Sequence, residues 1–210
     1  MVVGKENKMK KFLIIIIVMS IIFISACEAY TTNVYNKIIK IDIEINNYKD
    51  LYAIAQNRAQ EFETDLLLGY FDIVYEGIEN IKNRTAVIEY SFGKIIDGKG
   101  SNGHSCRINV KIDLKEKAIL ETVVIKGNTK AVGFPERNLG IDKWAICESD
   151  IFDIIFNKIS LDELFKYNNP SIEISGKNYG EDIFIISIEN NGSEIERWFI
   201  DSYTGEEIET

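Results

Sequence analysis

An apolar segment near the start of the chain constrains everything that follows it. Three lysines, Lys8, Lys10 and Lys11, precede an apolar run over residues 12–19, which resumes after Ser20. A basic flank, a short apolar stretch and an exit through small residues are typical of a secretory signal peptide. A membrane-spanning helix needs about 20 apolar residues, which is more than this run supplies. We therefore expect residues 1–26 to be a signal peptide and the folded part to lie outside the cytoplasm.

The segment ends in Ile24-Ser25-Ala26-Cys27. An aliphatic residue, a hydroxyl or small residue, a small residue and then cysteine resembles the lipobox of bacterial lipoproteins. The resemblance implies that Cys27 receives a diacylglycerol, becomes the mature N-terminus and holds the protein to membrane lipid on the extracytoplasmic face of the cell membrane. Two alternatives stay open: an uncleaved membrane helix, and ordinary cleavage near Ala26 or Ala29 without a lipid.

The charge of the chain argues against one class of partner. Residues 1–26 carry a net charge of +3, so their removal changes the formal net charge from −9 to −12 and leaves 184 residues. Binding to nucleic acid relies on Lys and Arg that neutralise phosphates, so we expect no nucleic-acid partner. Heavy use of Ile, Lys and Asn, with two prolines in the chain, is typical of AT-rich codons and indicates a low-GC Gram-positive source.

Two cysteines remain after Cys27 is assigned to the lipid. Cys106 and Cys147 are candidates for a disulfide, because an even pair in an exported protein often forms one. The alternative is two buried free thiols that act as small apolar fillers.

The periodicity of apolar residues predicts the elements of the first part of the chain. Residues 27–37 are polar without a period, which indicates a lipid anchor and tether. Alternation predicts a strand over 39–45, and spacings of three and four predict a helix over 48–67 that Gly69 ends. The remaining elements are strands at 71–81 and 85–92 around a turn at 82–84, a glycine-rich hairpin connection at 93–103, and strands at 107–114 and 118–126.

Residues 131–141 contain glycine and proline, lose periodicity and are predicted to be a linker. Asp142 is placed to cap a helix over 143–159, and Ser160 with Glu163 matches a capping box that starts a short helix. Strands are expected at 172–176, 182–189 and 194–200, the last two joined by an Asn191-Gly192 hairpin turn.

A helix followed by antiparallel strands thus appears twice, over residues 48–126 and 142–208. The short turns require antiparallel pairing. We predict an α+β fold of two halves, residues 38–130 and 142–210, each a helix on its own antiparallel sheet.

The last copy resembles the PepSY domain. The resemblance lies in Trp198-Phe199-Ile200-Asp201, the turn Thr204-Gly205 and the apolar Ile208. The first copy matches at Asp113 but has Lys117 where that family has glycine. The resemblance implies two PepSY-like halves and a non-catalytic role that restrains or regulates a peptidase, so the expected partner is an exported peptidase or envelope protein.

The sequence lacks a recognisable catalytic, cofactor or metal site. His104 and Cys106 form a His-Ser-Cys run, but the further ligands of a zinc site are missing. Four carboxylates on strand faces could bind calcium, but they lack the spacing of a calcium loop; they are Asp42, Glu44, Glu173 and Glu189. We expect a solvated acidic face instead.

Four aromatic residues could form a peptide-binding surface or belong to the core: Trp144, Trp198, Phe199 and Tyr203. Alternation sends Trp198 and Ile200 to one face and Phe199 to the other. The leading functional prediction is a non-enzymatic module that binds a protein or peptide. The alternatives are a cell-wall hydrolase that acts through two carboxylates with shifted pKa values in one cleft, and a structural subunit of an envelope complex.

Overall fold

The computed structural model describes residues 30–42, 48–98, 103–132, 135, 137–144, 148–178 and 181–208. The predictions made for the signal peptide, Cys27, Glu44 and Cys147 lie outside the described residues. Nearly all the remaining elements can be compared with the structure.

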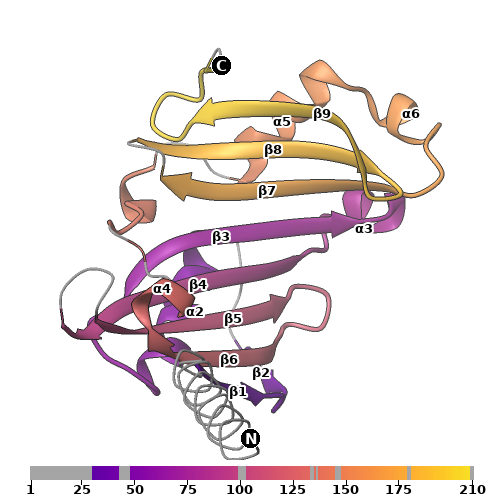
Figure 1. Cartoon of the computed structure of the whole chain (residues 1–210). Coiled ribbons are helices and arrows are strands. Elements are labelled where there is room, and N and C mark those ends of the chain that lie inside the picture. Colours follow the sequence, from indigo (N-terminus) through magenta and orange to yellow (C-terminus); the bar gives the residue numbers. More distant parts are fainter. Residues whose placement is uncertain are drawn as a thin grey trace, which may run out of the picture.

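The strands form one antiparallel sheet. Its order is β1-β6-β5-β4-β3-β7-β8-β9, with β2 also paired to β6 (Figure 1). The strands are β1 (Thr31–Tyr35), β2 (Ile39–Lys40), β3 (Leu67–Glu76), β4 (Val87–Asp97), β5 (His104–Asp113), β6 (Ala118–Asn128), β7 (Pro170–Asn178), β8 (Asp182–Asn190) and β9 (Ser193–Asp201). The two outermost strands of this sheet are therefore β1 and β9.

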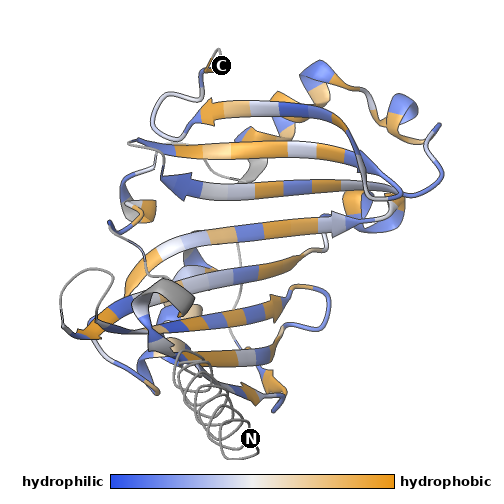
Figure 2. Cartoon of the chain, viewed as in Figure 1, coloured by the Kyte–Doolittle hydropathy of each residue, from blue (hydrophilic) through white to orange (hydrophobic). Residues whose placement is uncertain are grey.

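Two helices cover one face of the sheet. Figure 1 shows α2 (Tyr48–Gln60) and α5 (Glu148–Lys158) behind the strands. Figure 2 shows hydrophobic and hydrophilic residues alternating along the strands, as expected when each strand has one buried face. We call the face opposite α2 and α5 the open face. The short helical segments are α3 (Ile78–Asn83), α4 (Thr129–Val132), η2 (Ile141–Lys143) and α6 (Leu161–Leu164).

The prediction of two halves with separate sheets is wrong. Strands β3 and β7 pair with each other over six residues, from Phe71 opposite Gly176 to Glu76 opposite Ser171. This pairing, which we call the seam, joins all the strands into one sheet over one continuous hydrophobic core. The buried residues of α2 and α5 belong to that same core.

The seam depends on a close contact between Phe71 and Gly176. A Cβ at position 176 would lie 2.3 Å from Cε1 of the Phe71 ring, so the ring occupies the space that a larger residue would fill. Trp144 and Phe184 complete an aromatic cluster, with ring centroids 5.6 and 6.3 Å from that of Phe71 and 4.7 Å from each other. Three segments distant in the sequence thus meet on the seam.

Two segments predicted to be free of the fold belong to it. The middle of the predicted tether forms β1, whose residues pair from Thr31 opposite Lys126 to Tyr35 opposite Thr122. The end of the predicted linker packs into the core, where Leu139 and Ile141 are buried. Leu68 holds this segment, because its N–H donates to Asn138 Oδ1 at 2.7 Å and its carbonyl accepts from Leu139 N at 2.9 Å.

Local predictions around the helices need three corrections. The helix expected over 48–67 ends at Gln60, and Gly69 lies at a bulge in β3 instead of ending it. The turn expected at 82–84 is the end of α3, a short helix that follows Gly77 at φ 78°. The helix expected from 143 begins at Glu148, because Trp144 has an extended backbone.

Several turns agree with the sequence. Ser160 and Glu163 form the predicted capping box, and Asn191-Gly192 connects β8 to β9. Asp201 Oδ1 accepts from Tyr203 N at 2.8 Å and Thr204 N at 2.7 Å, and Gly205 has φ 78°. In the turn between β5 and β6, Lys117 also has a positive φ, 46°, although it is not a glycine.

Asp182, at the start of β8, ties three segments together. Its Oδ2 accepts from Gly140 N at 2.8 Å, Trp144 Nε1 at 3.0 Å and the Tyr203 hydroxyl at 3.2 Å. Its Oδ1 accepts from Asn178 Nδ2 at 2.6 Å. Burial opposes ionisation, but these donors together lower the pKa of Asp182 below its usual value. This hydrogen bonding holds Trp144 against the seam and explains why the backbone there is not helical.

Replacing Gly176 with alanine tests the seam. The new Cβ would overlap the Phe71 ring, so we expect Gly176→Ala to lower the free energy of unfolding by roughly 1–3 kcal/mol, as overpacking usually does. Chemical denaturation of the chain from Glu28 measures the change, with Ser171→Ala on the same strand as the control. Phe71→Leu should recover part of the loss in the double variant. Equal stability of Gly176→Ala and the parent would contradict this packing.

Replacing Asp182 with asparagine tests the buried carboxylate. A carboxyl group whose pKa is lowered in the folded state contributes stability at pH values above its unfolded pKa of about 3.9. This contribution is lost as the pH falls through the folded-state pKa. We expect Asp182→Asn to cost roughly 1–3 kcal/mol at pH 7, because an amide satisfies the donors less well. The difference from the parent should shrink as the pH falls below the unfolded pKa. If the difference in free energy of unfolding stays the same from pH 7 down to acid pH, the charge of Asp182 has no such role.

Candidate functional site

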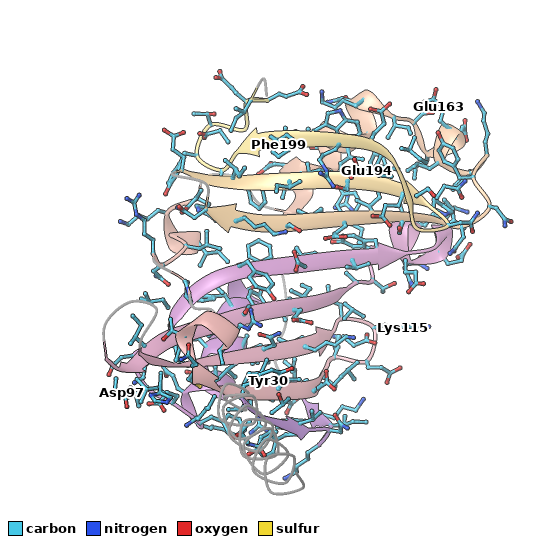
Figure 3. All side chains as sticks on the ribbon, in the orientation of Figure 1. Tyr30, Asp97, Lys115, Glu163, Glu194 and Phe199 are labelled. Carbon is cyan, nitrogen blue, oxygen red and sulfur yellow. The ribbon has the colours of Figure 1, made fainter. Side chains whose placement is uncertain are left out.

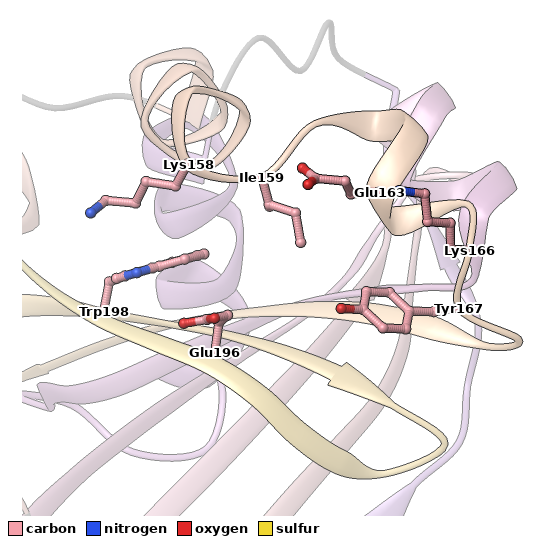
Figure 4. A pocket seen from close by; sticks show the side chains of 7 residues that line it. All are labelled: Lys158, Ile159, Glu163, Lys166, Tyr167, Glu196 and Trp198. Atoms are coloured by element: carbon pink, nitrogen blue, oxygen red, sulfur yellow. The ribbon is translucent and has the colours of Figure 1, made fainter.

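A groove lies beside β9, the outer strand at one edge of the sheet. It has a volume of about 480 Å³, and we call it the edge groove. Its lining comes from the end of α5, from α6 and the turn after it, and from β9; the residues are Lys158, Ile159, Glu163, Lys166, Tyr167, Glu196 and Trp198. Figure 4 shows Trp198 and Tyr167 on opposite sides, with Ile159 pointing between them and Glu196 on the strand below.

Apolar groups form the body of the edge groove and charges of both signs lie around them. Trp198 belongs to the core, but 9% of its surface remains exposed. Lys158 Nζ lies 5.4 Å from the centroid of the Trp198 ring and also pairs with Glu207 of the C-terminal segment. The groove therefore combines an aromatic surface with cationic and anionic partners, which suits a peptide better than a purely apolar ligand.

The capping box fixes one wall of the edge groove. The Glu163 carboxylate accepts hydrogen bonds from Ser160 N and Ser160 Oγ, both at 3.0 Å. These bonds lower the pKa of Glu163, so it stays ionised near neutral pH. Ser160 and Glu163 thereby set the direction in which the chain leaves α5 and place Tyr167 opposite Trp198.

Part of the outer edge of β9 forms backbone hydrogen bonds with the C-terminal segment. Ile208 N donates to the Phe199 carbonyl at 2.8 Å, and Asp201 N donates to the Glu206 carbonyl at 2.9 Å. Because backbone groups alternate along an antiparallel strand, the N–H and C=O of Arg197 also point outward. Within the described part of the chain, no backbone group outside the sheet pairs with them. This stretch of β9 lies directly next to Glu196 and Trp198 of the edge groove.

A second hollow, of about 590 Å³, lies on the open face over β3, β4, β5 and β7. We call it the acidic hollow, because five carboxylates line it: Asp72, Glu76, Glu89, Asp113 and Glu173. Asp72 lies directly opposite Glu89 on β4 and opposite Ser175 on β7. The Ser175 hydroxyl lies within hydrogen-bond distance of both Asp72 and Glu173, so its one proton is shared between two of the acids.

The acids of this hollow influence each other's ionisation. Burial, and then the negative charge of Asp72, raise the pKa of Glu89 above its usual value. Lys111, opposite Glu89 on β5, acts in the other direction, as does the bond of 2.8 Å from Asn109 Nδ2.

The structure separates most of the residues that the sequence singled out. Cys106 is a buried free thiol whose pKa is raised by burial. His104 is exposed and pairs with Asp97, with 2.9 Å between Nδ1 and Oδ1, instead of joining Cys106 in a site. Of the candidate calcium ligands, Glu173 lines the acidic hollow, Asp42 is exposed and Glu189 lies near the far end of β8.

The aromatic candidates divide as alternation predicted. Trp198 and Ile200 are buried, whereas Phe199 is half-buried on the other face. Trp144 is a core residue, and Tyr203 is 43% exposed while its hydroxyl reaches Asp182. Figure 3 shows Phe199 on β9, at the opposite edge of the sheet from Tyr30.

Sequence reasoning missed Lys158 and Tyr167 in the groove, and Asp72 and Glu89 in the hollow. The acids carried a usable signal, because each alternates with buried residues on its strand and must face outward. The sequence did not predict that Asp72 lies directly opposite Glu89, because this depends on the register between β3 and β4. That register could not be predicted, because α3 stands where a turn was expected.

Two absences hold for the part of the chain that the structure describes. No helix there is long and apolar enough to cross a membrane. No group of three or more His, Cys, Asp or Glu side chains there is arranged to hold a metal ion.

Comparison with known proteins gives no family. No family model matches the chain, and no curated protein matches its sequence significantly. Two solved structures are weakly similar: an acyl-ACP thioesterase from Bacteroides thetaiotaomicron (10% identity, TM-score 0.21) and a 12:0-ACP thioesterase from Umbellularia californica (9% identity, TM-score 0.19). Each alignment covers 80% of this chain and 95% of the other. Likeness at this level supports no conclusion about fold or function.

Removing the charge of Glu89 tests the electrostatics of the acidic hollow. A carboxyl group with a raised pKa destabilises the folded state above that pKa, and the penalty disappears below the unfolded value of about 4.3. We expect Glu89→Gln to be more stable than the parent at pH 7 by roughly 0.2–1 kcal/mol, because like charges no longer oppose. Thermal denaturation should show this advantage vanish near pH 4, whereas Glu76→Gln should change little. If Glu89→Gln is less stable than the parent at pH 7, the charge of Glu89 does not destabilise the folded state.

Proposed function

We propose that this chain is a lipoprotein, anchored through Cys27 to the extracytoplasmic face of the cell membrane, that binds an extended segment of a partner protein without catalysis. The edge groove and the neighbouring outer side of β9 form the binding site. The partner is an exported peptidase or another envelope protein, as the resemblance of the last strand and turn to PepSY sequences suggests.

One observation carries this proposal: β9 already accepts an extended segment on its outer side. The C-terminal segment pairs with Phe199 and Asp201, which shows that the strand is accessible to backbone hydrogen bonding there. A partner strand placed in line with this segment would meet the outward backbone of Arg197. Strand addition of this kind supplies affinity through the main chain and specificity through side-chain pockets.

The charges of this edge favour a selective ligand. Glu194, Glu196 and Arg197 are exposed, and such side chains discourage indiscriminate pairing between sheet edges. A suitable segment would place an apolar or aromatic side chain between Trp198 and Tyr167. Next to it, a basic residue would face Glu196 and an acidic residue would face Lys166 or Lys158.

A proline at position 197 tests this mode of binding. Proline lacks the outward N–H, and edge strands tolerate it because that group has no partner within the sheet. Overlapping peptides from the peptidases and envelope proteins exported by the same cell would be measured by fluorescence polarisation. We expect binders whose affinity falls at least tenfold in Arg197→Pro, since both a hydrogen bond and close approach are lost.

Arg197→Ala is the matched control, because it removes the same side chain and keeps the N–H. Tyr167→Ala should weaken the same peptides by roughly tenfold or more, as loss of an aromatic anchor usually does. Peptides that bind Arg197→Pro as tightly as Arg197→Ala would contradict strand addition. A complete peptide set without any binder would contradict the proposed function.

A second candidate, a hydrolase of the cell wall, is favoured by one observation. Asp72 and Glu89 lie opposite each other in the acidic hollow, and the raised pKa of Glu89 is what a general acid needs. This candidate requires release of soluble fragments from purified wall polymer by the parent and loss of that release in Glu89→Gln. Activity that persists in the variant would exclude this pair of residues.

A further inference from the structure

We infer that the β1 edge of the sheet is a membrane-contacting surface that rests in the headgroup layer of the bilayer. This inference rests on the proposed lipid anchor at Cys27 and goes beyond it, because an anchor alone does not determine which surface of the domain faces the membrane. The occupant we assign to this edge is a lipid surface containing anionic headgroups.

The first argument is the short distance between the anchor and the sheet. Two residues, Glu28 and Ala29, separate Cys27 from Tyr30, and β1 begins at Thr31. Three extended residues span at most about 11 Å, so the Cα of Tyr30 lies within that distance of the Cα of Cys27. Because the diacylglycerol fixes Cys27 at the bilayer surface, the start of β1 must lie there as well.

The second argument is the exposure of apolar side chains along this edge. Seven large hydrophobic residues are exposed in the described structure, and four of them lie within nine consecutive residues: Tyr30 (58%), Val34 (50%), Tyr35 (40%) and Ile38 (62%). Val34 and Tyr35 point to opposite faces of the sheet, so both sides of the edge are apolar. Tyrosine is enriched where a protein meets the membrane interface, because its ring is apolar and its hydroxyl stays hydrated.

The third argument is charge. The mature chain is strongly acidic, yet between Tyr30 and Lys40 the charged residues are two lysines, Lys37 and Lys40. Both are exposed. Lysines beside an apolar surface attract it to anionic lipid headgroups, whereas the acidic remainder of the protein is repelled from them. Charge therefore orients the domain with the β1 edge toward the bilayer.

This orientation places the edge groove away from the membrane. Seven strand-to-strand steps separate β1 from β9 in the sheet order. At about 4.8 Å for each step, β9 would stand roughly 30 Å from the lipid surface. Figure 1 shows these two strands at opposite ends of the sheet. The sheet thus acts as a spacer that presents its outer edge to proteins in the envelope.

Spin labels on the full-length lipidated protein test the inference. Single cysteines at Val34→Cys and Ile38→Cys, each in a background with Cys106→Ala and Cys147→Ala, would be labelled after reconstitution into vesicles of phosphatidylcholine and phosphatidylglycerol at three to one. Phe165→Cys, an exposed apolar position next to the edge groove, is the matched control. We expect labels at 34 and 38 to lose at least half of their accessibility to an aqueous nickel reagent and to gain accessibility to oxygen. The label at 165 should remain aqueous.

The outcomes separate this inference from the proposed function. Mass spectrometry first establishes whether Cys27 carries the diacylglycerol, and its absence would overturn both. With the lipid present, labels at 34 and 38 as accessible to nickel as the label at 165 would overturn the membrane-contacting edge alone. Spin–spin broadening between labels at 34 on two molecules would show that β1 edges pair with each other, which would also overturn it.

Discussion

The contact between Phe71 and Gly176 is the constraint on which the rest of the structure depends. It lies where β3 and β7 meet, and the missing side chain at 176 lets the Phe71 ring close over the seam. Trp144 and Phe184 then pack against that ring from two other segments. Without this junction the strands before and after residue 144 would share no hydrogen bonds within a sheet, and a single core could not form.

Asp182 extends the same junction toward the C-terminus. By accepting from Trp144, Gly140 and Tyr203, it fixes the connecting segment and the last turn relative to β8. The C-terminal segment that leaves this turn pairs with β9, and Glu207 reaches Lys158 beside the edge groove. The core and the proposed binding edge are therefore linked through one buried carboxylate.

Local patterns in the sequence predicted much of this fold, whereas the pairing between distant strands could not be predicted from them. Alternation located most strands, and the Ser160 capping box and the Asn191-Gly192 turn form as expected, because such features depend on neighbouring residues alone. The pairing of β3 with β7 depends on one glycine opposite one aromatic residue about a hundred positions away, which no periodicity reveals. Part of the predicted tether forms β1 for a similar reason, since its order comes from backbone pairing with β6. For the candidate site, residue type and alternation on the strands indicated Trp198 and Glu173. The residues that surround them in space depend on strand register and on the path of α6.

One continuous sheet joins the proposed membrane edge to the proposed binding edge, and residue-resolved hydrogen exchange of the native protein tests this continuity most directly. Central amides of β5 and of β8 would be compared with the free energy of global unfolding. If the seam joins all strands into one cooperative unit, both sets exchange with that same free energy. Exchange of β8 and β9 amides at a clearly lower free energy, while β4 to β6 stay protected, would show that the two parts open independently and would contradict the account.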